Sequence, residues 1–183
     1  MESSGNTNNI RHIQKVSQRY VALLNFLAFL VPAFALLFWV FFNQLPDWLL
    51  SGLPATPVQD LTLLQLLLGF AVSLLPVSVA VYGLVILKKL FSLYARAIIF
   101  SVENVFIFRR FAQVLFAWVV TTSLFTPLIS LVVSYNNPVG QRTLVAELGL
   151  FDLFTVIIGG IFLVISWVMN EGHRMDDEQT HTI

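Results

Sequence analysis

The stretch Leu90–Phe111, LFSLYARAIIFSVENVFIFRRF, decides how this chain folds. It is punctuated by charged and polar residues, and long apolar runs precede and follow it. An apolar run of about 20 residues can cross the hydrocarbon core of a membrane as a helix. We therefore interpret this stretch as the turn of a helical hairpin whose two legs enter a membrane.

The composition excludes a soluble domain. Hydrophobic residues make up 57% of the 183 residues, and charged residues make up only 11%. A soluble domain carries roughly 25% charged residues, so this chain could not cover a core with a polar surface. The composition predicts an integral membrane protein.

The apolar runs predict an all-α bundle of four transmembrane helices, arranged as two hairpins. Residues 1–19 form an N-terminal segment, residues 88–110 the hairpin tip, and residues 170–183 a tail. A helical pattern that runs from Val102 to about Val133 is longer than a membrane requires, so helices two and three should extend into the cytosol. The four spans are expected at about 20–42, 61–87, 111–133 and 148–169.

The basic residues are distributed unevenly among these segments. Nine of the ten Lys and Arg residues fall in residues 1–19, 88–110 and 170–183, and Arg142 alone falls between the third and fourth spans. Cytoplasmic segments of membrane proteins carry the excess of Lys and Arg. We therefore expect a multi-pass protein of the cell (inner or plasma) membrane, with both termini and the tip in the cytoplasm.

Polar groups inside the predicted spans are few. Asp152 is the only acid there, near the outer edge of the fourth span, where its carboxylate could reach the headgroups; an acid deep in the membrane would instead indicate a functional site. Small residues and prolines within the spans favour helix packing and bending over a substrate path. These residues are Gly69, Ser73, Gly159 and Gly160, with Pro32, Pro76 and Pro127.

No pattern in the sequence predicts catalysis. The chain has no cysteine, and its three histidines, at positions 12, 173 and 181, lie near the termini and do not form a cluster. We find no phosphate-binding glycine loop and no metalloprotease motif. The sequence therefore predicts no catalytic residues, no metal and no cofactor, and a protein that is not an enzyme.

Two stretches resemble the small bacterial membrane family known as domain of unknown function 2975 (DUF2975). Residues 90–112 are similar to its L-F-x-L-Y … F-S-x-E-N-V … R-R signature, and residues 167–183 to its E-G-x-x-L-x-x-E pattern. Ala97 and Ala112 stand where the family often has glycine. The matching residues are Leu90, Phe91, Leu93, Tyr94, Phe100, Ser101, Glu103, Asn104, Val105, Arg110, Glu171, Gly172, Glu178, Thr182 and Ile183.

The resemblance implies four membrane helices and a companion protein, a small helix-turn-helix transcription regulator, but no established activity. Because the matching residues concentrate in the tip and the tail, we expect a regulatory protein that holds such a partner there. A small-molecule or ion transporter, a channel or an immunity-type protein is the alternative. Besides the lipid bilayer and this regulator, a homo-oligomer stays open as a partner, and no direct nucleic-acid contact is expected. The candidate partner-binding residues are Tyr94, Arg96, Ser101, Glu103, Asn104, Arg109, Arg110, Glu171, Met175 and Glu178.

Local details of the tip and the chain ends can also be predicted. Ser101 precedes a helical run with Glu103 and Asn104 in its first turn, so we expect it to be an N-cap. Residues 1–9 should lack regular structure. The tail is acidic and the tip basic, so the tail could fold back onto the tip with Met175 as its apolar contact. Alternatively, the basic residues meet lipid headgroups and the tail stays unstructured.

Overall fold

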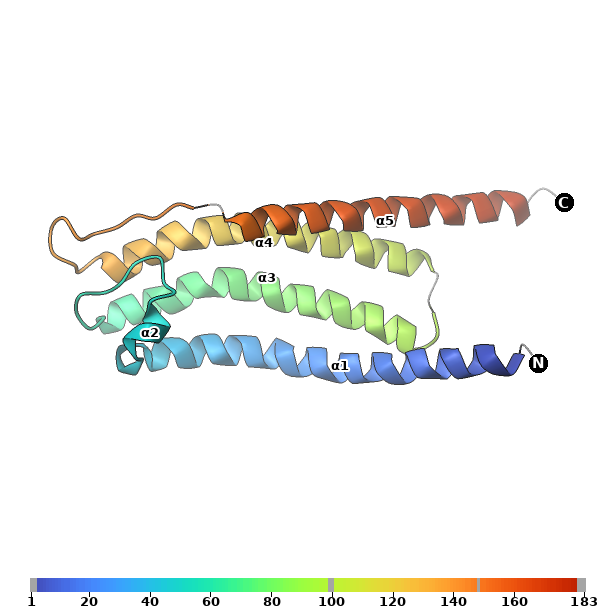
Figure 1. The fold of residues 1–183 in the computed structure, drawn as a ribbon, viewed down its shortest axis with the longest axis horizontal. Coiled ribbons are helices and arrows are strands. Elements are labelled where there is room, and N and C mark those ends of the chain that lie inside the picture. Colours follow the sequence, from blue (N-terminus) through green and yellow to red (C-terminus); the bar gives the residue numbers. More distant parts are fainter. Residues whose placement is uncertain (1–2, 99–100, 148, 181–183) are drawn as a thin grey trace. The chain divides into compact units, whose positions relative to one another are not determined.

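The structure is a computed structural model that describes residues 3–98, 101–147 and 149–180. Within these residues it is helical and contains no strand (Figure 1). The elements are α1 (Ser3–Val40), the short 3-10 helix η1 (Phe42–Gln44), α2 (Asp47–Leu50), α3 (Leu63–Ala95), α4 (Val102–Ser134) and α5 (Leu150–Thr180).

Four of the helices are long and apolar enough to cross a membrane. The qualifying segments lie in α1, α3, α4 and α5, and each contains an apolar window with at most two charged residues. Helices α3 and α4 have 33 residues each, or about 50 Å at 1.5 Å per residue. Each exceeds the roughly 30 Å hydrocarbon core. The prediction of an all-α fold with four long membrane helices is confirmed.

Both ends of the chain are more helical than we expected. Helix α1 begins at Ser3, inside the segment expected to lack structure. Helix α5 continues to Thr180 without a turn, so the tail neither folds back onto the tip nor stays unstructured over residues 170–180. Apart from Gly172, residues 170–180 are compatible with a helix and include no proline. The exposed pair Glu171–Arg174, with nitrogen and oxygen 3.4 Å apart, adds i,i+3 support.

The chain divides into two compact units, each built from parts of the long helices. Unit 1 contains residues 1–28, 82–116 and 154–183, and unit 2 contains residues 29–81 and 117–153. In unit 1, the α3–α4 connection lies at the end where α1 begins and α5 finishes (Figure 1). In unit 2, the α1–α3 and α4–α5 connections share one end (Figure 1).

Small residues allow the helices of unit 1 to approach closely. A Cβ at Gly83 of α3 would lie 3.1 Å from Val114 of α4, and a Cβ at Gly159 of α5 would lie 3.3 Å from the ring of Phe116. The buried Ser166 hydroxyl of α5 donates to the Val105 carbonyl of α4 at 3.1 Å. The predicted packing role is confirmed for Gly159, whereas Gly160 has open space around it.

Unit 2 has an aromatic core around Trp39. The Trp39 indole stacks on Phe42 with ring centroids 5.1 Å apart, and its Nε1–H donates to Ser73 Oγ at 2.8 Å. The Ser73 hydroxyl in turn donates to the Gly69 carbonyl at 2.8 Å. Gly69 faces the indole so closely that a Cβ there would overlap it. Packing is therefore the role of Gly69 and Ser73, as predicted.

The residues after α4 run back along that helix, held by two buried serines. The Ser134 hydroxyl accepts from the Thr143 N–H at 3.1 Å, and it can donate to the Ser130 carbonyl at 2.7 Å or to the Thr143 carbonyl at 3.1 Å. One turn deeper, the Ser130 hydroxyl accepts from the Val145 N–H at 3.1 Å. The segment satisfies its backbone polar groups in this way, and α5 therefore begins beside the middle of α4.

Candidate functional site

The hairpin tip is closed by a Schellman motif at the end of α3. The Ala97 N–H donates to the Tyr94 carbonyl at 3.0 Å, and the Ile98 N–H donates to the Leu93 carbonyl at 3.0 Å. These are the two bonds of that motif. Ala97 has φ 61°, the left-handed conformation that glycine adopts most easily. This explains physically why glycine would suit the position where this chain has alanine.

We expect Ala97→Gly to stabilise the protein by about 1 kcal/mol, because glycine adopts the left-handed conformation without the steric cost of a Cβ. The measurement is the free energy of unfolding in detergent. Ala95→Gly is the matched control: Ala95 is the last residue of α3, so glycine there should cost up to about 1 kcal/mol. Equal destabilisation by both changes would contradict the assignment of the motif.

Ser101 and Asn104 close the other side of the tip. The Asn104 N–H donates to the Ser101 hydroxyl at 3.4 Å, so the prediction that Ser101 is an N-cap is confirmed. The Asn104 side chain is fully buried, and its Nδ2 donates to the Ile98 carbonyl at 3.4 Å. The side chain of Asn104 thus joins the first turn of α4 to the end of the Schellman motif.

Ser101→Ala should lower the free energy of unfolding by about 1 kcal/mol, because the Asn104 N–H loses its side-chain acceptor. Ser101→Asp should be tolerated, since a carboxylate also accepts this bond and suits the positive helix end. Denaturant titration of the three proteins provides the measurement. If Ser101→Ala leaves the free energy of unfolding unchanged and Ser101→Asp lowers it, Ser101 does not stabilise α4 as an N-cap.

The structure separates the predicted site residues into two groups. Ser101 and Asn104 are part of the tip's own architecture, and Tyr94 is half-buried with its ring 6.2 Å from that of Phe91. Met175 and Glu178 lie on the last turns of α5, and their side chains lie outside the described part of the structure. The remaining predicted residues are exposed and available for contact: Arg96, Glu103, Arg109, Arg110 and Glu171.

Large apolar side chains are also exposed at the tip, which the sequence analysis missed. Ile98, Val102 and Phe106 are exposed, Phe106 by 58%. Val102 and Phe106 are four residues apart and therefore share one face of α4. Both lie nearer the hairpin turn than Arg109 and Arg110 do. The sequence does show Val102 and Phe106 four residues apart and ahead of Arg109 and Arg110. We did not predict their exposure, because we considered only the residues that match the family signature.

Helix α5 adds two apolar side chains at the same height. Ser166 contacts Val105, so the next residues, Trp167 and Val168, lie at about the height of the first turn of α4. They are 65% and 67% exposed. We define the tip face as the exposed residues Arg96, Ile98, Val102, Glu103, Phe106, Trp167 and Val168.

Asp152, in the first turn of α5, lies beside the middle of α4. Thr122, midway between Arg110 and Ser134 on α4, has its hydroxyl oxygen 3.3 Å from Asp152 Oδ1, within hydrogen-bond distance. The Asp152 carboxylate also accepts from the Gly149 N–H at 2.9 Å. This is the back-bond of a capping box, from the third helical residue to the N-cap. Asp152 lies in the first turn of α5, at the edge of the fourth candidate span, as predicted. What the sequence did not predict is that this edge lies beside the middle of α4, because the segment before α5 runs back along that helix.

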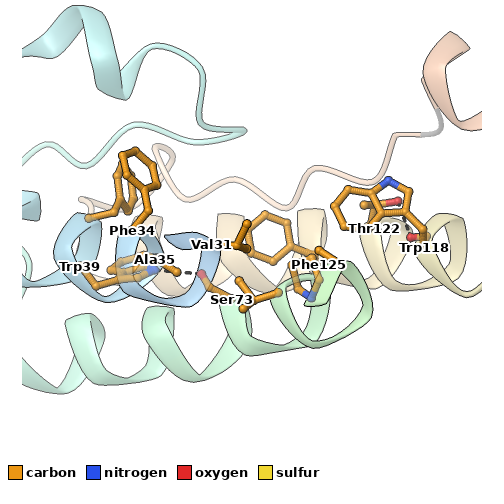
Figure 2. Close-up of a pocket in the computed structure, with 12 residues that line it drawn as sticks. Val31, Phe34, Ala35, Trp39, Ser73, Trp118, Thr122 and Phe125 are labelled. Atoms are coloured by element: carbon orange, nitrogen blue, oxygen red, sulfur yellow. Dashed lines mark hydrogen bonds between the residues drawn. The ribbon is translucent and has the colours of Figure 1, made fainter. Parts of the chain in front are cut away.

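Unit 2 contains an apolar groove of about 380 Å³ (Figure 2). Trp39 and Ser73 lie at one end, and Trp118 and Thr122 at the other (Figure 2). The Ser73 hydroxyl is engaged with Trp39, and the Thr122 hydroxyl has the Trp118 carbonyl at 3.0 Å and the Asp152 carboxylate at 3.3 Å as alternative acceptors. The groove therefore offers apolar surface and no free polar group for orienting a ligand. Among the described residues, no group of three His, Cys, Asp or Glu side chains could hold a metal ion.

Four long apolar helices with these packed contacts define an all-α membrane protein. The family model described as Protein of unknown function (DUF2975) matches residues 22–183, and the chain belongs to this family. The resemblance drawn from the tip and tail sequences is thereby confirmed. No curated protein and no solved structure matches the chain.

Proposed function

We propose that this protein is a binding protein of the bacterial cell membrane that holds a soluble regulator on its cytoplasmic tip face. The observation that carries this proposal is the exposure of Ile98, Val102 and Phe106 beyond Arg109 and Arg110. Exposed apolar groups gathered outside a membrane mark sites of protein contact. Binding, rather than catalysis, is the activity that such a surface supports.

The chemistry of the tip face fits a protein partner. Its apolar side chains can serve as anchors, and large aromatic residues such as Phe106 and Trp167 are enriched in the cores of protein interfaces. Arg96 and Glu103 lie beside them, and charged residues at the rim of an interface improve specificity. The orientation toward the cytoplasm rests on the nine basic residues of the inward segments. The family resemblance implies the partner, a small helix-turn-helix regulator.

The test is co-purification of the full-length chain with the helix-turn-helix protein encoded beside it. Phe106→Asp should abolish co-purification while the free energy of unfolding stays within about 0.5 kcal/mol, because the side chain is exposed. Val139→Asp is the matched control: Val139 is 96% exposed and lies in the α4–α5 connection of unit 2. Unchanged co-purification in both variants would contradict the proposal.

A second function, ion- or proton-coupled transport, is favoured by the position of Asp152 beside the middle of α4. Ionisable residues at such depth often serve ion or proton pathways. Asp152→Asn separates the two functions, because an amide oxygen can still accept the Gly149 N–H but cannot exchange a proton. Transport would be lost in this variant, whereas a carboxylate that only caps α5 tolerates the change.

A further inference from the structure

Four basic residues of unit 1 lie at one height on two helices that touch. Helices α3 and α4 make contact where Gly83 faces Val114. Lys88 follows Gly83 by five residues, and Arg109 precedes Val114 by five residues, so both lie about 7.5 Å from this contact in the same direction. Lys89 and Arg110 are their chain neighbours. We call these four residues the basic belt.

The charges of the basic belt are not compensated nearby. Lys89, Arg109 and Arg110 are exposed, and Lys88 is half-buried. The only ion pair among the described residues joins Glu171 to Arg174. Glu103, the only acid on the α3 and α4 segments of unit 1, lies about two turns from Arg110. Helix α5 presents Phe162 at this height, since its ring packs against Phe108 and Phe111. Three exposed basic side chains and the half-buried Lys88 therefore lie at one height, with no acidic partner among the described residues.

The basic belt also marks the border between apolar and polar helix surface. The apolar run of α3 ends at Leu87, and that of α4 begins at Phe111. At a similar height on α1, Tyr20 stacks on Phe91 with ring centroids 4.8 Å apart and is 45% exposed. Tyrosine is enriched where membrane helices meet the headgroup region. The belt thus lies where phosphate groups of lipids would be.

We propose that the basic belt binds the phosphate of an anionic phospholipid and so fixes the height of the tip above the membrane. Guanidinium groups donate two parallel hydrogen bonds to phosphate oxygens, and ammonium groups add point charges. Basic pockets between membrane helices recognise anionic headgroups in this way. This inference is independent of the soluble partner, because the belt lies between the tip face and the apolar runs.

The test is native mass spectrometry of the full-length protein released from bilayers of equal phosphatidylglycerol and phosphatidylcholine. The wild type should retain phosphatidylglycerol about tenfold over phosphatidylcholine. The variant K88Q/K89Q/R109Q/R110Q should lose this preference. The control variant R11Q/K15Q/R96Q/R142Q removes the same number of charges elsewhere and should keep it. Equal retention in the two variants would overturn the proposal.

Two further arms keep the result decisive. If the fourfold variant does not fold in neutral lipid, R109K/R110K keeps the charge, removes the bidentate donors and should show a reduced preference. If excess inorganic phosphate releases the lipid, the site serves a soluble phosphate ligand and the lipid proposal fails. It also fails if R109Q/R110Q loses the helix-turn-helix partner but keeps the full phosphatidylglycerol preference.

Discussion

Gly69→Val lowers the free energy of unfolding by about 3 kcal/mol, the upper part of the usual range for an overpacked core. A Cβ at this position overlaps the Trp39 indole. The ring cannot easily move aside, because it donates to Ser73 and stacks on Phe42. Trp39 is only 4% exposed, so the neighbouring side chains resist its displacement. Denaturant titration in detergent measures the loss.

Gly160→Val is the matched control, since a Cβ at Gly160 meets nothing within 4 Å. It should change stability by no more than about 1 kcal/mol, the difference in helix propensity. Combining Gly69→Val with Trp39→Leu should cost less than the sum of the two single changes, because the smaller side chain makes room for valine. Additive costs, or equal losses at Gly69 and Gly160, would show that the indole does not require the glycine.

Asn104→Leu lowers the free energy of unfolding by about 2 to 3 kcal/mol. The side chain is fully buried, and its Nδ2–H donates to the Ile98 carbonyl. A leucine leaves that carbonyl without this donor, and a buried polar group that loses its partner costs about 1–3 kcal/mol. Because Ile98 ends the Schellman motif, backbone amide exchange should accelerate in residues 94–98 as well as in the first turn of α4.

Glu103→Ala, next in sequence but exposed, is the control for Asn104 and should stay within about 0.5 kcal/mol. Binding of the proposed regulator should also respond to Asn104→Leu. This change disorders the tip and should weaken binding although Asn104 does not contact the regulator. Adding Ala97→Gly stabilises the tip and should recover part of the binding. A stable Asn104→Leu variant with normal amide exchange would show that Asn104 does not hold the tip together.

The features predicted correctly from the sequence are those that depend on neighbouring residues. Long apolar runs determine membrane helices, and Ser101 caps α4 because its hydroxyl needs to reach only three residues ahead. The tail was mispredicted because its charge pattern suggested attraction to the tip. Exposed ion pairs contribute at most about 1 kcal/mol, too little to outweigh an uninterrupted helix.

The features that could not be predicted depend on contacts between distant residues. Nothing local shows that residues 143 to 145 bond to Ser130 and Ser134, and this contact decides where α5 starts along α4. The position of Asp152 beside Thr122 and the height of Trp167 along α4 both follow from it. Likewise, Trp39 and Gly69 are 30 residues apart in sequence. Only their contact in the structure shows that the Trp39 indole needs a residue without a side chain at position 69. For the candidate site, the position of the tip and the Ser101 cap were predictable from the sequence. The sequence did not show that Asn104 is buried and stabilises the tip, whereas Arg96 and Glu103 are exposed on it.

Labelling of single cysteines with a membrane-impermeant maleimide tests the central claim, that the tip face lies in water on the cytoplasmic side. The chain has no cysteine of its own, so Phe106→Cys reports on the tip, and Val139→Cys, in the α4–α5 connection and 96% exposed, reports on the opposite side. Phe106→Cys should react in inside-out vesicles and not in intact cells, and Val139→Cys should react in intact cells only. Reaction of Phe106→Cys in intact cells, or its failure to react until detergent is added, would contradict the account.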